Sequence, residues 1–172
     1  MTVRAAIRLD FVPEMRLIWR TSRYVRDFYG NVLSDPDACA RVMLTAHELL
    51  ENAAKYSADG HGQLEIDLLE RDGQAYVRIK TCNRAAGERL AELRRFFDES
   101  GRTPDPIALY DQMIARTAQR TDGSGLGLAR IRAEGEMCLS HSIDGDAVTI
   151  VAETPVRLKG EVQLAAARGA KR

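Results

Sequence analysis

The sequence predicts an α+β fold: a two-layer α/β sandwich in which helices cover one face of a mixed, mostly antiparallel sheet. The Asp-Gly pairs at 72–73 and 144–145 each separate two runs of alternating apolar and polar residues, which is the strongest short-range signal for a β-hairpin. Between these hairpins, and before the first one, apolar residues recur at helical spacing. Because strands and helices do not alternate strictly, the pattern argues against a doubly wound fold.

Start and stop signals set the order of the elements. Pro13 is suited to the first turn of a helix that Gly30 ends, and Pro36 opens a longer helix. The pair of prolines at 104 and 106 separates two later helices. In order, we expect a strand around 5–9, helices over 13–30 and 36–57, hairpin strands around 64–68 and 77–79, helices over 86–99, 107–120 and 125–136, and hairpin strands over 139–143 and 147–153.

Length and composition limit the kind of protein. The chain has 172 residues, of which 45% are hydrophobic and 29% charged, as expected for one globular domain over 1–158 followed by a flexible basic tail over 159–172. Its 25 basic and 25 acidic residues give no net charge, which argues against a nucleic-acid partner. No stretch approaches the roughly 20 apolar residues of a membrane span. The three cysteines lie far apart, which predicts reduced, buried thiols and a cytoplasmic location.

The first stretch that indicates chemistry lies near the end of the second helix. Glu48 and Asn52 are four residues apart, so both side chains can reach one metal ion or one water molecule. Lys55 lies on the same stripe, beside the apolar face, and the three suit a polar ligand. A solvated charged stripe is the alternative. A zinc-protease site is excluded because Glu51 stands where the second histidine of that motif would be.

The second stretch is the glycine-rich loop over 122–128. Glycines let successive backbone N–H groups face one anion, which suits a polyphosphate. Leu128 replaces the third glycine of a dinucleotide-binding fingerprint, and the chain has no Gly-Lys-Ser/Thr of a P-loop. The alternative is a flexible turn with a glycine-rich helix cap.

Together, the two stretches resemble the motifs of the GHKL superfamily of ATPases, and the short chain resembles its bacterial anti-sigma-factor serine/threonine kinases. The resemblance implies the Bergerat-type α/β sandwich, with ATP and Mg²⁺ bound. It makes Glu48 the general base, Asn52 the Mg²⁺ ligand and Lys55 a contact to phosphate or ribose. The lid over the β- and γ-phosphates would comprise Gly123, Gly125, Leu126 and Gly127.

One motif departs from the family pattern. The Asp-x-Gly-x-Gly box, whose aspartate accepts a hydrogen bond from the adenine amino group, is replaced by a segment that begins at Asn83 and ends at Gly87. An asparagine carbonyl can accept the same bond without charge, but Ala85 occupies the place of a glycine. The altered box resembles that of a SiaB-like subgroup, whose members phosphorylate STAS-domain partners.

The resemblance therefore predicts an ATP/Mg²⁺-dependent serine/threonine protein kinase acting on a small STAS-domain (anti-anti-sigma) protein in a bacterial partner-switching pathway. It also suggests a sigma factor as a further partner, and a homodimer. The alternative is a non-catalytic binding module of the same fold, with weak or no nucleotide binding. A stand-alone histidine kinase is disfavoured, because the segment before residue 36 is too short for a phosphoacceptor hairpin and His47 lies inside the site helix.

The charge distribution adds a condition on this site. The tail carries Lys159, Arg168, Lys171 and Arg172 against Glu161, a net +3, which leaves −3 for residues 1–158. A phosphate site in this mildly acidic body must rely on backbone N–H groups, on Lys55 and on a bound cation.

Overall fold

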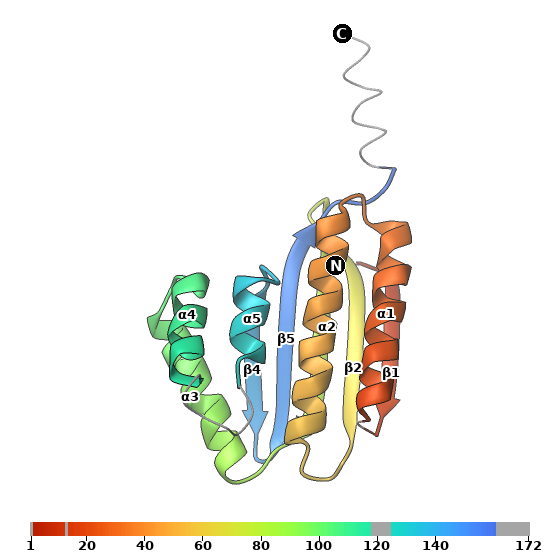
Figure 1. The fold of residues 1–172 in the computed structure, drawn as a ribbon. Helices are drawn as coiled ribbons and strands as arrows, with labels where there is room; N and C mark the ends of the chain where they lie inside the picture. Colours follow the sequence, from red (N-terminus) through yellow and green to blue (C-terminus); the bar gives the residue numbers. More distant parts are fainter. Residues whose placement is uncertain (1, 13, 118–124, 161–172) are drawn as a thin grey trace.

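A computed structural model of the chain describes residues 2–12, 14–117 and 125–160. The order of its elements is the one that the sequence predicts (Figure 1). The elements are β1 (Thr2–Phe11), α1 (Met15–Val32), α2 (Pro36–Tyr56), β2 (Gly62–Arg71), β3 (Gln74–Arg84), α3 (Glu88–Arg102), α4 (Pro106–Thr117), α5 (Gly127–Ala133), β4 (Cys138–Asp144) and β5 (Ala147–Val156).

The sheet has five strands in the order β1-β2-β3-β5-β4, and each of these neighbouring pairs is antiparallel. Both predicted hairpins are present, as β2–β3 and β4–β5. At the first turn, Asp72 and Gly73 have φ of 53° and 78°, the left-handed conformation that a type I′ hairpin turn requires at both positions. The predicted fold class is confirmed, with a sheet that is antiparallel throughout its described strands.

Helices cover one face of this sheet, and α1, α2 and α5 lie side by side over it (Figure 1). Apolar side chains from the helices and the inner strands fill the space between the two layers. The fully buried ones include Ile18, Val25, Val42, Leu49, Leu64, Ile66, Val77, Ile79 and Ile131. This core fixes the position of α2, the helix that carries the first motif.

Cross-strand ion pairs connect charged side chains of β1, β2 and β3. Asp67 lies 2.7 Å from an Arg8 nitrogen and 3.1 Å from an Arg78 nitrogen, and Lys80 lies 3.4 Å from Glu65. On β2 these acidic residues alternate with the core positions Leu64 and Ile66, so they belong to the opposite face of the sheet. Charges on that face are consistent with the predicted two-layer arrangement.

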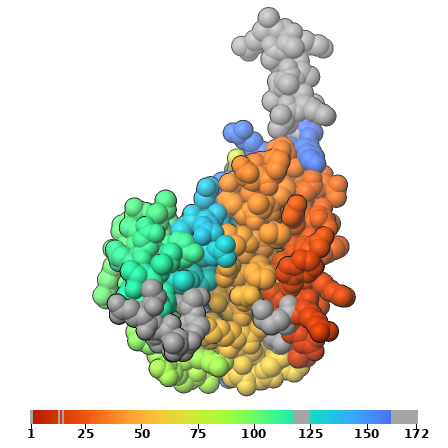
Figure 2. Space-filling view, in the orientation of Figure 1, coloured from red at the N-terminus to blue at the C-terminus, as the bar shows by residue number. Residues whose placement is uncertain are grey.

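The helices α3 and α4 form a lobe beside α5 and β4 (Figures 1 and 2). Phe97 of α3 stacks on His141 of β4, with ring centroids 3.7 Å apart. Phe96 on the same helix is buried, as is Leu109 of α4. These contacts attach the lobe to the main body.

Some expected boundaries and burial states differ from those observed. The helix expected over 125–136 spans only Gly127–Ala133, because the chain turns into β4 at Gly135 and at Glu136, whose φ is 50°. Of the cysteines, Cys39 is buried and Cys138 is exposed, so the prediction of buried thiols is wrong for the latter. In the described part of the chain, no helix is both long and apolar enough to span a bilayer.

We expect Gly135→Ala to destabilise the fold. A methyl group at this position would lie 2.5 Å from the Ile131 carbonyl oxygen and 2.9 Å from Thr45 Oγ1 on α2. Relieving such an overlap typically costs about 1–3 kcal/mol. At Gly30 in α1 a methyl group meets nothing within 4 Å, so Gly30→Ala should stabilise the helix by about 0.5–1 kcal/mol. Urea denaturation measures both, and a Gly135→Ala protein as stable as wild type would contradict the close approach of α5 to α2.

Candidate functional site

The two sequence motifs meet at a single point between α2 and α5. A methyl group at Gly127, the first residue of α5, would lie 2.7 Å from Glu48 Oε2, 3.3 Å from Asn52 Nδ2 and 3.4 Å from Asn52 Oδ1. No side chain fits between this backbone and the two polar groups, so the glycine is needed for the close approach. The last glycine of the loop motif therefore lies directly against the acid and the amide of the helix motif.

Asn52 carries a buried side-chain amide. Its Nδ2 forms no hydrogen bond with the described residues. Leaving a buried amide donor unsatisfied costs about 1–3 kcal/mol, which a ligand oxygen or a water molecule would recover. Within the described ranges, His, Cys, Asp and Glu residues form no group of three or more able to hold a metal ion. Asn52 Oδ1 is nevertheless a hard oxygen ligand of the kind Mg²⁺ accepts when phosphates and waters supply the rest of its shell, so the residues fit the ion.

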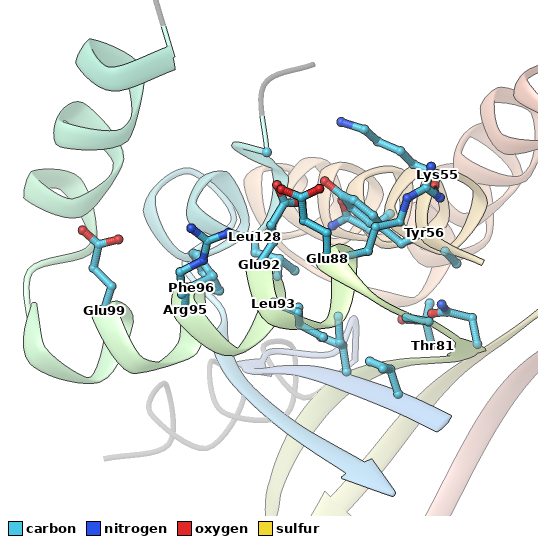
Figure 3. Close-up of a pocket in the computed structure, with 18 of the residues that line it drawn as sticks. Lys55, Tyr56, Thr81, Glu88, Glu92, Leu93, Arg95, Phe96, Glu99 and Leu128 are labelled. Atoms are coloured by element: carbon cyan, nitrogen blue, oxygen red, sulfur yellow. Dashed lines mark hydrogen bonds between the residues drawn. The ribbon is translucent and has the colours of Figure 1, made fainter. Parts of the chain in front are cut away.

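A cavity of about 610 Å³ opens beside this point, within the usual size range of small-molecule sites (Figure 3). Thr81 of β3 lines it together with Val148 and Ile150 of β5, and α2, α3, α4 and α5 contribute the other walls. Four residues predicted from the sequence to bind the ligand line the cavity: Asn52, Lys55, Asn83 and Gly125.

Charged side chains from α2, α3 and α4 line the cavity, four of them basic and three acidic: Lys55, Arg89, Arg95, Arg116, Glu88, Glu92 and Glu99. Two of the cations lie near the ring of Tyr56, at 5.3 Å for Lys55 Nζ and 5.9 Å for the Arg89 guanidinium carbon. Figure 3 shows Lys55 and Tyr56 at the end of α2, close in view to Glu88 and Glu92 of α3. The end of α2 thus brings cationic and acidic side chains together at the cavity, with Lys55 and Arg89 as cations that could contact an anionic ligand.

The altered box lies at the end of β3. Asn83 belongs to the strand instead of following it, and its Nδ2 donates to the Arg84 carbonyl at 3.2 Å, which leaves Oδ1 as the available acceptor. Ala85 is buried, and its N–H donates to the Asp146 carbonyl at 2.8 Å. Gly87 precedes α3 with a φ of 60°, which favours glycine, but it does not line the cavity.

The glycine loop is described only in part. Gly123 lies outside the described residues. Gly125, with a φ of 55°, lines the cavity, and Leu126 accepts a hydrogen bond from the Arg130 N–H at 2.9 Å. The role of these residues as a phosphate lid stays a prediction.

The sequence interpretation missed Arg130, whose Nη1 lies 3.0 Å from Glu48 Oε1. Glu48 is only 8% exposed and ion-paired, so the alternative of a solvated charged stripe is wrong at this position. A signal was available, because Arg130 follows Gly127 by three residues and helical spacing puts both on one face.

An antiparallel sheet covered by helices on one face is consistent with a GHKL-like α/β sandwich. A chain in the crystal structure of the SiaB–SiaC complex from Pseudomonas aeruginosa superimposes on this protein with a TM-score of 0.59 and 14% sequence identity. The superposition covers 87% of this chain and 89% of that one. The predicted GHKL-like, SiaB-like relation is thereby confirmed at the level of the fold.

The sequence itself is similar to sensory kinases. Adaptive-response sensory kinase SasA from two strains of Prochlorococcus marinus, MIT 9215 and AS9601, is 28% identical over 131 residues, which cover 73% of this chain and 31% of each relative. The chain thus spans about a third of the length of the curated relatives it matches. No family model matches the sequence.

Proposed function

We propose that this protein is an ATP/Mg²⁺-dependent serine/threonine kinase that phosphorylates a small STAS-domain protein in a bacterial partner-switching pathway. The observation that carries the proposal is the convergence of Glu48 and the Asn52 amide on Gly127, beside a cavity large enough for a nucleotide. The SiaB-like fold and the similarity to a sensory kinase support a regulatory protein of this kind.

Glu48 is the proposed general base. Its Oε2 accepts the proton of the substrate hydroxyl while that oxygen forms a bond to the γ-phosphorus of ATP. The bond between the γ-phosphorus and the β,γ-bridging oxygen breaks, and ADP leaves with the electron pair. Phosphoryl transfer depends mostly on positioning and charge stabilisation, so beyond this one base the other residues of the site serve to bind and orient the nucleotide.

The other residues bind and orient the nucleotide. Asn52 Oδ1 would hold Mg²⁺, which neutralises phosphate charge when bound. Lys55 contacts a phosphate or the ribose, and Asn83 Oδ1 accepts a hydrogen bond from the adenine amino group. The loop that contains Gly123 and Gly125 covers the phosphates.

The proposal includes the cellular setting implied by the family resemblance. The protein would act in the cytoplasm as a homodimer, and a sigma factor would be a further partner. These features depend on the resemblance and would be tested by co-purification and by sedimentation analysis.

The direct test is incubation of the protein with γ-labelled ATP and its cognate STAS protein. We expect acid-stable label on a serine or threonine of that partner, whereas a phosphohistidine would be acid-labile. Glu48→Ala should transfer no label. No transfer by either protein would refute the proposed activity.

Removal of the proposed adenine contact should weaken nucleotide binding. We expect Asn83→Ala to lower ATP affinity up to about tenfold, the effect of one lost hydrogen bond. Asn83→Asp should tighten binding, because a charged acceptor makes a stronger bond. Calorimetry with ATP and GTP measures both, and an Asn83→Ala protein that binds ATP as tightly as wild type would exclude this contact.

A non-catalytic binding module is the second candidate. Two observations favour it: Ala85 fills the place of a glycine in the adenine box, and the Glu48 carboxylate is already paired with Arg130. It predicts stable complex formation with a protein partner in the absence of nucleotide, and no dependence of that complex on Asn52.

A further inference from the structure

The two oxygens of the Glu48 carboxylate have different surroundings. Oε1 lies 3.0 Å from Arg130 Nη1. Oε2 is the atom that a methyl group at Gly127 would approach to 2.7 Å, on the side where the Asn52 amide also lies. One oxygen is therefore held by the guanidinium, and the other faces the point where the two motifs meet.

Arg130 makes a second hydrogen bond, to a carboxylate other than that of Glu48. Its Nε donates at 2.8 Å to Oε2 of Glu134, the C-cap residue of α5. Tyr110 of α4 adjoins the same carboxylate: burial raises the pKa of this phenol most, and the charge of Glu134 and a hydrogen bond to it raise it further. Two hydrogen bonds thus connect Glu134, Arg130 and Glu48, from the end of α5 to α2.

This arrangement restricts the orientation of the Glu48 side chain. Breaking a buried ion pair by moving one partner away is strongly disfavoured, so the guanidinium holds the carboxylate in place. A guanidinium is planar and offers donors in a fixed fork, and Arg130 uses two of them on two carboxylates. Rotation of the Glu48 carboxylate would break its bond to Nη1.

We propose that Arg130 is a positioning residue, which holds Glu48 Oε1 so that Oε2 is presented to the hydroxyl of the protein substrate. The inference rests on the proposed kinase activity and adds to it a residue that acts only through Glu48. Glu134, at the C-cap of α5, supports the guanidinium through its hydrogen bond with Nε.

The kinetic test compares Arg130→Gln with a matched control, Arg71→Gln. Arg71 is also ion-paired to a glutamate, Glu153, and its side chain is 42% exposed against 41% for Arg130, but it lies at the β2–β3 turn and its partner belongs to β5 instead of α2. We expect Arg130→Gln to lower kcat about 100-fold with the KM for ATP unchanged, as for a misplaced catalytic group. Arg71→Gln should match wild type, and Arg130→Lys should recover part of the rate.

A double-mutant cycle shows whether Arg130 acts through Glu48. If it does, Glu48→Gln/Arg130→Gln should be no slower than Glu48→Gln alone. If the fold-losses in rate of the two single variants multiply in the double variant, Arg130 contributes independently of Glu48, and the inference is overturned.

The same double-mutant cycle can be measured on stability against urea, independently of activity. Arg130→Gln should lower the urea midpoint because it leaves a buried carboxylate unpaired, and adding Glu48→Gln should restore part of it. An unchanged midpoint in Arg130→Gln would refute the pairing. A wild-type protein that transfers no phosphate but shows this coupling would instead refute the proposed kinase function.

Discussion

Replacing Glu48 by glutamine is expected to lower the rate of phosphoryl transfer by about 10²–10⁴-fold, the usual contribution of a positioned general base. Glutamine keeps the size of the side chain and a carbonyl oxygen that can accept from Arg130, but it cannot take a proton from the substrate hydroxyl. The affinity for Mg²⁺·ATP should change little, because Asn52 and the cavity wall are unaffected. Single-turnover transfer to the STAS partner and calorimetry separate the two effects.

Glu51→Gln is the matched control on the same helix. Glu51 lies three residues further along α2 and is paired with His47 at 3.1 Å, and its side chain is 38% exposed against 11% for Glu48. Its loss should leave transfer unchanged. Equal losses in both variants would indicate a general disturbance of α2, and full activity of Glu48→Gln would assign the base to another residue.

Much of the fold could be predicted because its signals are local. The hairpin turns require residues that tolerate positive φ, and Asp72–Gly73 supplies them. Apolar residues that recur at helical spacing in α1 and α2, such as Ile18 and Leu49, are fully buried. The placement of β5 between β3 and β4 depends instead on long-range pairing, which no local pattern encodes.

The residues of the candidate site also fall into two groups, those that local motifs indicate and those that only tertiary packing reveals. Glu48, Asn52 and Gly127 belong to short motifs with chemical meaning, so sequence reading could select them. The burial of Glu48 depends on α5 packing against α2, which helical periodicity within α2 cannot reveal. Arg130 was missed because its importance comes from that tertiary contact, although its spacing from Gly127 placed it on the right face.

Replacing Asn52 by alanine should reduce the affinity for Mg²⁺·ATP by about 100-fold or more, because even outer-shell partners of a bound metal contribute about 10–100-fold. The substitution removes the proposed oxygen ligand together with the buried Nδ2 that lacks a partner among the described residues. Chelation of Mg²⁺ should weaken ATP binding to wild type by a similar factor, and it should have little further effect on Asn52→Ala if the amide acts through the ion. Titration calorimetry with and without a chelator measures all four affinities.

Asn31→Ala provides the control, since Asn31 is an exposed asparagine of α1 whose amide donates to the Asp27 carbonyl at 2.9 Å. Its ATP affinity should equal that of wild type. If Asn52→Ala and wild type give the same heats with Mg²⁺·ATP, the kinase proposal fails at its first step, and the non-catalytic binding module becomes the better account of the same fold. If Asn52→Ala loses ATP binding while Asn31→Ala keeps it, a binding module that does not bind nucleotide is excluded. Such a module would not require an amide at the junction of α2 and α5 for metal-dependent ATP binding.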